Sequence, residues 1–161
     1  MDALEIAKNI ELEGKAYYEK LAIDSPLKSL SGVFSLLAKE EQKHYNLFDS
    51  WQKNKAVPAP AQPGSASAEA KRIFSGISKQ FTFPQPVYDY VQAWGKALEM
   101  ERNSISVYEE MLGKALSPDE KGILKFLIVE EQKHEHLVEH LLEFANEPTV
   151  FLENAEFNHL A

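Results

Sequence analysis

Apolar side chains recur at steps of four and three residues through four long stretches of the chain, at about 2–23, 26–55, 86–115 and 118–146. This period matches one face of an α-helix, so each stretch is predicted to be an amphipathic helix whose inward row packs against the others. We call this inward row the seam. In the second stretch it reads Leu30, Phe34, Leu37, Glu41, His44, Phe48 and Trp51.

Residues with known preferences for helix ends delimit the four stretches. Asp2 is predicted to cap the first helix and Ser25 the second. Ser117 and Glu120 have the spacing of a capping box at the start of the fourth helix, which should end at Pro148. The connections within each pair of helices are therefore short, and each pair is predicted to be an antiparallel hairpin.

The segment at about 56–85 connects the two hairpins. Its first part, from Val57 to Gly64, holds three prolines and is not expected to be helical. Ser67 is a candidate cap for a short helix ending near Phe74. Thirty residues are enough to span a helix of about 40 Å, so we expect this crossover to return the chain to the other end of the bundle.

One pentapeptide occurs twice in the chain. The run Glu40-Glu41-Gln42-Lys43-His44 returns 90 residues later as Glu130-Glu131-Gln132-Lys133-His134. The same shift pairs Glu11 with Glu101, Tyr18 with Tyr108, Leu37 with Leu127 and Leu47 with Leu137. The chain is therefore interpreted as two copies of one helical hairpin.

These patterns predict an all-α protein of one domain, residues 1–161, folded as an antiparallel four-helix bundle. Hairpin 1 covers about 2–55, the crossover about 56–85, hairpin 2 about 86–146 and a C-terminal tail 147–161. The tail carries Phe151, Leu152 and Phe157 and is apolar enough to dock on the bundle, as a short helix.

Each long helix places one glutamate in the seam, where leucine would ordinarily pack: Glu11, Glu41, Glu101 and Glu131. His44 and His134 follow the second and fourth of these by three residues, on the same side of the helix. Unpaired buried carboxylates cost on the order of several kcal/mol each, so positive charge is required. Two divalent cations balance four carboxylates, and this ligand set is typical of di-iron and di-manganese bundles.

Other positions near this predicted site keep two interpretations each. Gly14 and Ser104 lie in the seam, where small side chains leave room for oxygen or peroxide, or simply let helices pack closely. Tyr18 and Tyr108 are placed to donate hydrogen bonds to ligand carboxylates, in a supporting catalytic role, or to fill the core. The remaining pentapeptide residues lie outside the seam and are predicted to be bystanders: Glu40, Gln42, Lys43, Glu130, Gln132 and Lys133.

Composition narrows the chemistry. The 161 residues contain no cysteine, which excludes disulfides, thiolate nucleophiles and cysteine-ligated iron–sulfur centres. A net charge of -8 disfavours nucleic acid and anionic membranes as partners. The acidic start, Met1 to Glu5, is unlike a signal peptide, and no apolar run reaches transmembrane length, so we expect a cytoplasmic protein.

A zinc peptidase pattern, His-x-x-Glu-His, occurs at His136, Glu139 and His140. Both histidines lie outside the seam and no third ligand is evident, so we reject this interpretation.

The motifs Glu11-x-x-Gly14, Glu41-x-x-His44, Glu101-x-x-Ser104 and Glu131-x-x-His134, with the two tyrosines, resemble the rubrerythrin branch of the ferritin-like superfamily over about residues 2–146. The resemblance implies a ferritin-like bundle holding two iron ions, with Glu41 and Glu131 bridging them and Glu11 and Glu101 terminal. It also implies reduction of hydrogen peroxide or oxygen, in response to oxidative stress, and a homodimer that is domain-swapped in some members.

The sequence departs from this family in two ways. Full-length rubrerythrins carry a rubredoxin-like domain with four cysteines, so this chain would need an external donor such as a rubredoxin-like protein. The best known members have a further glutamate where this chain has Ser104, which puts a redox-driven iron shift in doubt. Two alternatives stay open: a dimanganese catalase-like enzyme, since manganese or a mixed pair suits the same ligands, and a non-catalytic, ferritin-like iron-buffering protein.

Overall fold

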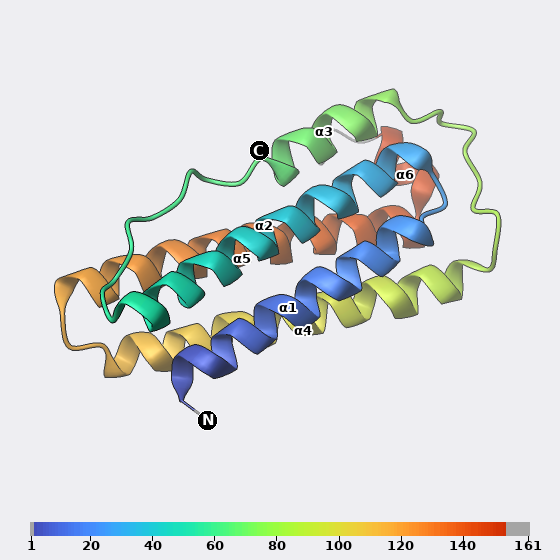
Figure 1. The fold of residues 1–161 in the computed structure, drawn as a ribbon. Coiled ribbons are helices and arrows are strands. Elements are labelled where there is room, and N and C mark those ends of the chain that lie inside the picture. The colour runs from blue at the N-terminus through green and yellow to red at the C-terminus, as the bar shows by residue number, and fades with distance from the viewer. Residues whose placement is uncertain (1, 154–161) are drawn as a thin grey trace.

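The computed structural model describes residues 2–153, which form four long helices and two short ones (Figure 1). The helices are α1 (Ala3–Ile23), α2 (Lys28–Asn54), α3 (Ala66–Gly76), α4 (Val87–Lys114), α5 (Pro118–Asn146) and α6 (Pro148–Glu153). No strand occurs among the described residues. The predicted all-α bundle of two hairpins is confirmed.

Two of the predicted helix caps are present. The Asp2 carboxylate accepts a hydrogen bond of 2.9 Å from the Glu5 N–H at the start of α1. The Ser117 hydroxyl accepts one of 3.1 Å from the Glu120 N–H at the start of α5. Each cap satisfies a backbone N–H that has no acceptor within its own helix, so the chain stops and restarts at these positions.

The other two predicted caps are wrong. The residue at the N-cap of α2 is Leu27, not Ser25, because the Ser25 hydroxyl instead donates to the Leu27 carbonyl at 2.7 Å within the turn. The short helix α3 begins one residue before Ser67, with Ser65 at its N-cap and no side-chain hydrogen bond there. Neither Ser25 nor Ser65 caps a helix N–H with its side chain. The Ser25 hydroxyl bonds within the turn, and Ser65 makes no side-chain hydrogen bond at the N-cap.

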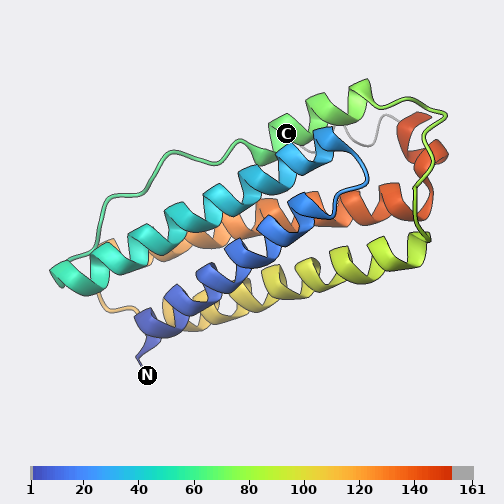
Figure 2. The ribbon, with the colours of Figure 1, turned by 45° about the vertical axis from the view of Figure 1, so that its right-hand side comes forward.

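The two hairpins lie side by side, and their first helices, α1 and α4, start at opposite ends of the bundle (Figures 1 and 2). Helix α1 is antiparallel to α2 and lies along α4, and α4 is antiparallel to α5 (Figures 1 and 2). The crossover, including α3, runs along the bundle from the end of α2 to the start of α4 (Figures 1 and 2). It therefore returns the chain to the other end, as predicted, and docks the second hairpin on the first of the same chain.

Aromatic packing anchors the crossover to the bundle. Phe74 of α3 is buried, and its ring centroid lies 5.4 Å from that of Phe144 in α5 and 4.9 Å from that of Phe151 in α6. Phe151 and Leu152 are both buried, so this part of the tail docks as the short helix predicted. Phe157 lies outside the described residues.

The apolar core is divided into two clusters by a polar layer. One cluster holds Phe34 and Trp94, and the other holds Phe48 and Tyr108. Along each long helix the seam glutamate lies between residues of the two clusters. The polar residues are therefore enclosed by apolar side chains at both ends. Across residues 2–153, no helix combines the length and hydropathy needed to cross a membrane.

Candidate metal centre

The polar layer brings together the six predicted ligands from all four long helices. They form two overlapping groups whose ligand atoms lie within 4.8 Å of one another: Glu11, Glu41, His44 and Glu131, and Glu41, Glu101, Glu131 and His134. Each residue is at most 3% exposed. Only Glu41 and Glu131 belong to both groups, so each group takes ligands from both hairpins.

The histidines reach across from one hairpin to the other. His44 Nδ1 lies 2.9 Å from Glu131 Oε1, and His134 Nδ1 lies 2.9 Å from Glu41 Oε1. The two rings are stacked with their centroids 5.8 Å apart. Both Nδ1 atoms therefore face the carboxylates, as ligands of one central site would.

Each lone glutamate is held by a tyrosine of the other hairpin. The Tyr18 hydroxyl donates to Glu101 Oε1 and the Tyr108 hydroxyl to Glu11 Oε1, both at 2.5 Å. Burial, together with the adjacent carboxylate, raises the pKa of both phenols well above its usual range. Both tyrosines are therefore neutral hydrogen-bond donors that orient the two carboxylates, which favours the hydrogen-bonding interpretation over core filling alone.

Burial makes the carboxylates of this layer hard to ionise together. It raises the pKa of Glu11, Glu41 and Glu101 well above the ordinary value, and neighbouring carboxylates add to the effect. Glu131 differs: burial opposes its ionisation, but His44 and the hydrogen bonds from both histidines hold its pKa well below the ordinary value.

The pKa values of both imidazoles are raised, which favours their positively charged form. Burial lowers the pKa of each ring, but Glu131 beside His44 and Glu101 beside His134 more than offset it, and both pKa values are raised. Without a cation, protons on carboxyls and imidazoles must neutralise the site. A bound cation would replace those protons.

Several carboxylate oxygens in this layer lack a hydrogen-bond donor. Oε2 of Glu11, of Glu101 and of Glu131 is buried and has no hydrogen-bond partner within residues 2–153. Buried oxygens without partners are costly, and they are the atoms that a metal ion binds. The set of buried carboxylate and imidazole donors fits a metal centre in number, charge and chemistry.

The model of the rubrerythrin family matches residues 2–142. The chain belongs to the rubrerythrin family. No curated protein and no solved structure gave a match. Family membership and the buried Glu and His cluster together indicate a metal centre in this rubrerythrin.

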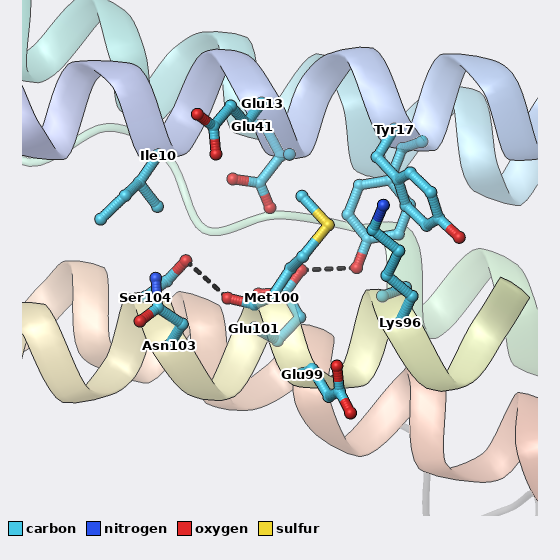
Figure 3. Close-up of a pocket in the computed structure, with 13 residues that line it drawn as sticks. Ile10, Glu13, Tyr17, Glu41, Lys96, Glu99, Met100, Glu101, Asn103 and Ser104 are labelled. Carbon is cyan, nitrogen blue, oxygen red and sulfur yellow. Dashed lines mark hydrogen bonds between the residues drawn. The ribbon is translucent and has the colours of Figure 1, made fainter. Parts of the chain in front are cut away.

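A cavity of about 250 Å³ opens between α1 and α4 beside the cluster (Figure 3). Gly14 and Ser104 line it, and so do the ligand candidates Glu41 and Glu101. The Ser104 hydroxyl donates to the Met100 carbonyl of its own helix at 3.0 Å. Both small residues therefore border open space, which supports the access interpretation over close packing alone.

Two residues predicted to be bystanders are buried. Glu40 is 7% exposed and Glu130 is 3% exposed, so they do not lie on a solvent-exposed face, although neither belongs to the two ligand groups. The crossover covers the helix face next to the seam, and Gly64 donates its N–H to Glu130 Oε1 at 2.6 Å. The repeat of the pentapeptide is the only sequence signal that points to these two glutamates. Lys43 is exposed.

The zinc peptidase pattern gains no support in the rubrerythrin fold. His140 is buried and its Nδ1 lies 2.9 Å from the His136 carbonyl oxygen, so this nitrogen is engaged within its own helix. Neither histidine belongs to a residue group able to hold a metal ion in the described part of the chain.

Proposed function

We propose that this rubrerythrin binds two iron ions at the six clustered residues and reduces hydrogen peroxide, or oxygen, with electrons from an external donor. The observation that carries the proposal is the pair of overlapping four-residue groups that share Glu41 and Glu131. Sharing of this kind suits two ions held side by side. The family match supports iron as the metal.

The proposed role of each residue follows from its place in the two ligand groups. Glu41 and Glu131, common to both groups, would bridge the ions, and Glu11 and Glu101 would each hold one ion, as the family resemblance implies. Their four charges balance two divalent cations, with neutral imidazoles completing the set. Tyr18 and Tyr108 keep Glu101 and Glu11 oriented through their hydrogen bonds.

The cavity between α1 and α4 gives a small oxidant a route to the cluster. Its lining includes Glu13, Lys96 and Glu99, so the entrance suits small polar molecules. The bound iron would supply two electrons, which with two protons convert one hydrogen peroxide into two waters. Without cysteine the chain has no rubredoxin-type iron site, so we propose an external rubredoxin-like donor. The homodimer and the cytoplasmic location stay predictions.

Stopped-flow oxidation of the iron-loaded, reduced protein by hydrogen peroxide tests the activity. We expect fast oxidation and many turnovers when a reduced rubredoxin is supplied. A single slow oxidation without turnover would contradict the peroxidase proposal and favour iron buffering.

Metal analysis of protein purified from its native host tests the cofactor. We expect two iron atoms per chain. Two manganese atoms per chain would instead favour the catalase-like alternative.

A further inference from the structure

Outside the six clustered residues, the crossover closes over two more carboxylates. Glu130 Oε1 accepts the Gly64 N–H at 2.6 Å, and its Oε2 pairs with Lys133 Nζ at 2.9 Å. A methyl group on Gly64 would overlap the carboxylate of Glu40. Gly64 thus lies against both side chains, and a Cβ at this position would require the Glu40 carboxylate to move.

Glu40 faces the outer edge of a ligand histidine. Its Oε1 lies 3.7 Å from His134 Nε2, while its Oε2 is buried without a hydrogen-bond partner among the described residues. The other ring nitrogen of His134, Nδ1, faces inward, 2.9 Å from Glu41 Oε1 and 3.3 Å from Glu101 Oε1. The imidazole therefore points one nitrogen at the cluster and the other at Glu40.

This geometry has a chemical consequence once Nδ1 binds a cation. The ring proton must then reside on Nε2, and a buried N–H needs an acceptor. A carboxylate that accepts a hydrogen bond from this N–H fixes the tautomer and orientation of the ring. Glu40 Oε1 lies beside His134 Nε2, and Glu40 Oε2 has no hydrogen-bond partner within residues 2–153.

We propose that Glu40 is a positioning residue for the metal ligand His134, accepting the Nε2 hydrogen, and that Gly64 closes the crossover over this pair. The inference rests on the proposed function, because it requires His134 to bind a metal through Nδ1. The counterpart Glu130 has both oxygens engaged by Gly64 and Lys133, so its role is to hold the crossover. The two glutamates occupy equivalent positions of the repeat but have different roles: Glu40 positions His134, and Glu130 holds the crossover.

Three variants of the full chain test the proposal: Glu40→Ala, Glu40→Gln and, as the matched control, Glu130→Ala. Cobalt(II) is titrated into each and followed by visible absorption. We expect Glu40→Ala to weaken one of the two cobalt equivalents by about 10- to 100-fold. Glu40→Gln should retain more affinity, because its amide oxygen still accepts a hydrogen bond. Glu130→Ala should leave both affinities close to wild type and lower thermal stability.

NMR of the zinc-loaded protein gives a second measurement that does not depend on activity. The Nε2 proton of His134 should be visible and protected from exchange in wild type, shifted in Glu40→Gln and lost in Glu40→Ala. An unchanged resonance in Glu40→Gln would overturn the inference, and this variant decides the matter if Glu40→Ala does not fold.

The outcomes separate the two proposals. If wild type binds fewer than two metal ions, the proposed function fails. If wild type binds two and Glu40→Ala binds them equally well, only the role of Glu40 fails. Equal weakening by Glu40→Ala and Glu130→Ala would also overturn it, because both would then act only by supporting the crossover.

Discussion

The two copies of the pentapeptide have identical sequences and occupy equivalent helices, yet they match on one side only. Facing the cluster, His44 and His134 make the same 2.9 Å approach to the glutamate of the other copy. On the outer side, Glu40 lies beside a ligand histidine and Glu130 accepts a backbone N–H from the crossover.

The difference originates in the crossover, which is not part of the repeated hairpins. The crossover passes over α2 and α5 once, so it places Gly64 asymmetrically between two equivalent carboxylates. Identical local sequence therefore gives equivalent inner hydrogen bonds, where the partners are also repeated, and different outer contacts, where they are not.

The largest effect should come from the residues common to both ligand groups. We expect Glu41→Ala and Glu131→Ala each to abolish binding of both metal ions, because both groups lose a ligand at once. Metal content after loading and desalting measures this. Glu13→Ala, an exposed glutamate lining the cavity, is the control and should still bind two. Two ions bound by either inner variant would show that the site is misplaced.

A pH series comes next, since five buried groups act in the same direction. The pKa values of three glutamates and both histidines are raised on folding, so metal-free protein gains stability from their protons. This contribution is complete below the unfolded values, about 4.3 for Glu and 6.5 for His, and is lost as pH rises through the folded ones.

The melting temperature of metal-free protein should therefore fall as pH rises above about 4.3, the unfolded value of Glu. Glu131, with its lowered pKa, contributes stability above its unfolded pKa and loses it only in acid. The gain in melting temperature on adding metal should rise over the same range. A metal-free melting temperature that increases toward pH 8 would contradict this assignment.

Gly64→Ala sharpens the comparison at the asymmetric contact. The added methyl group overlaps the Glu40 carboxylate, which must move away from its buried position, so we expect a loss of about 1–2 kcal/mol in the free energy of unfolding, measured with urea. The same substitution at Gly32 is the control. It lies exposed in α2, and beyond its own helix backbone no atom of the described residues lies within 4 Å of a new Cβ, so Gly32→Ala should stabilise by about 0.5–1 kcal/mol. A stabilised Gly64→Ala protein would show that the crossover is not held against Glu40.

The smallest effects should come from the symmetric tyrosines. Tyr18→Phe and Tyr108→Phe each remove one hydrogen bond of 2.5 Å to a buried carboxylate. We expect each to cost about 1 kcal/mol of metal-free stability, since the freed carboxylate can take up a proton. Tyr88→Phe, at an exposed position, should change little. Clearly unequal losses of stability in Tyr18→Phe and Tyr108→Phe would show that the two tyrosines are not equivalent, and that only the ligands are symmetric.

The helical period was sufficient to predict the bundle and to bring the six inner residues together. It works because Glu41 and His44 repeat the spacing of the leucines around them, so whatever buries Leu37 buries them too. The Tyr18 hydrogen bond to Glu101 was predictable for the same reason, as both lie on the seam.

The role of Glu40 could not be predicted this way. It lies one residue from the seam, on a face that an amphipathic helix usually turns to solvent, and it is buried by a segment more than 20 residues away. A periodic pattern reports only that a face is apolar, and Pro-rich crossovers carry no period that shows where they dock. The predicted Ser25 cap was wrong because the Ser25 hydroxyl donates to a turn carbonyl and does not cap a helix N–H.

The reciprocal contacts at the centre have a consequence for how such a protein can arise. Tyr18 bonds to Glu101 as Tyr108 bonds to Glu11, and the histidines approach the opposite glutamates at equal distances. Each half contributes to the other what it receives, which is the relation across a two-fold axis. Two copies of a single ancestral hairpin could therefore have assembled the whole cluster as a symmetric dimer. Duplication and fusion would then have required only a connecting segment, the crossover, whose contacts made the outer sides of the two halves unequal.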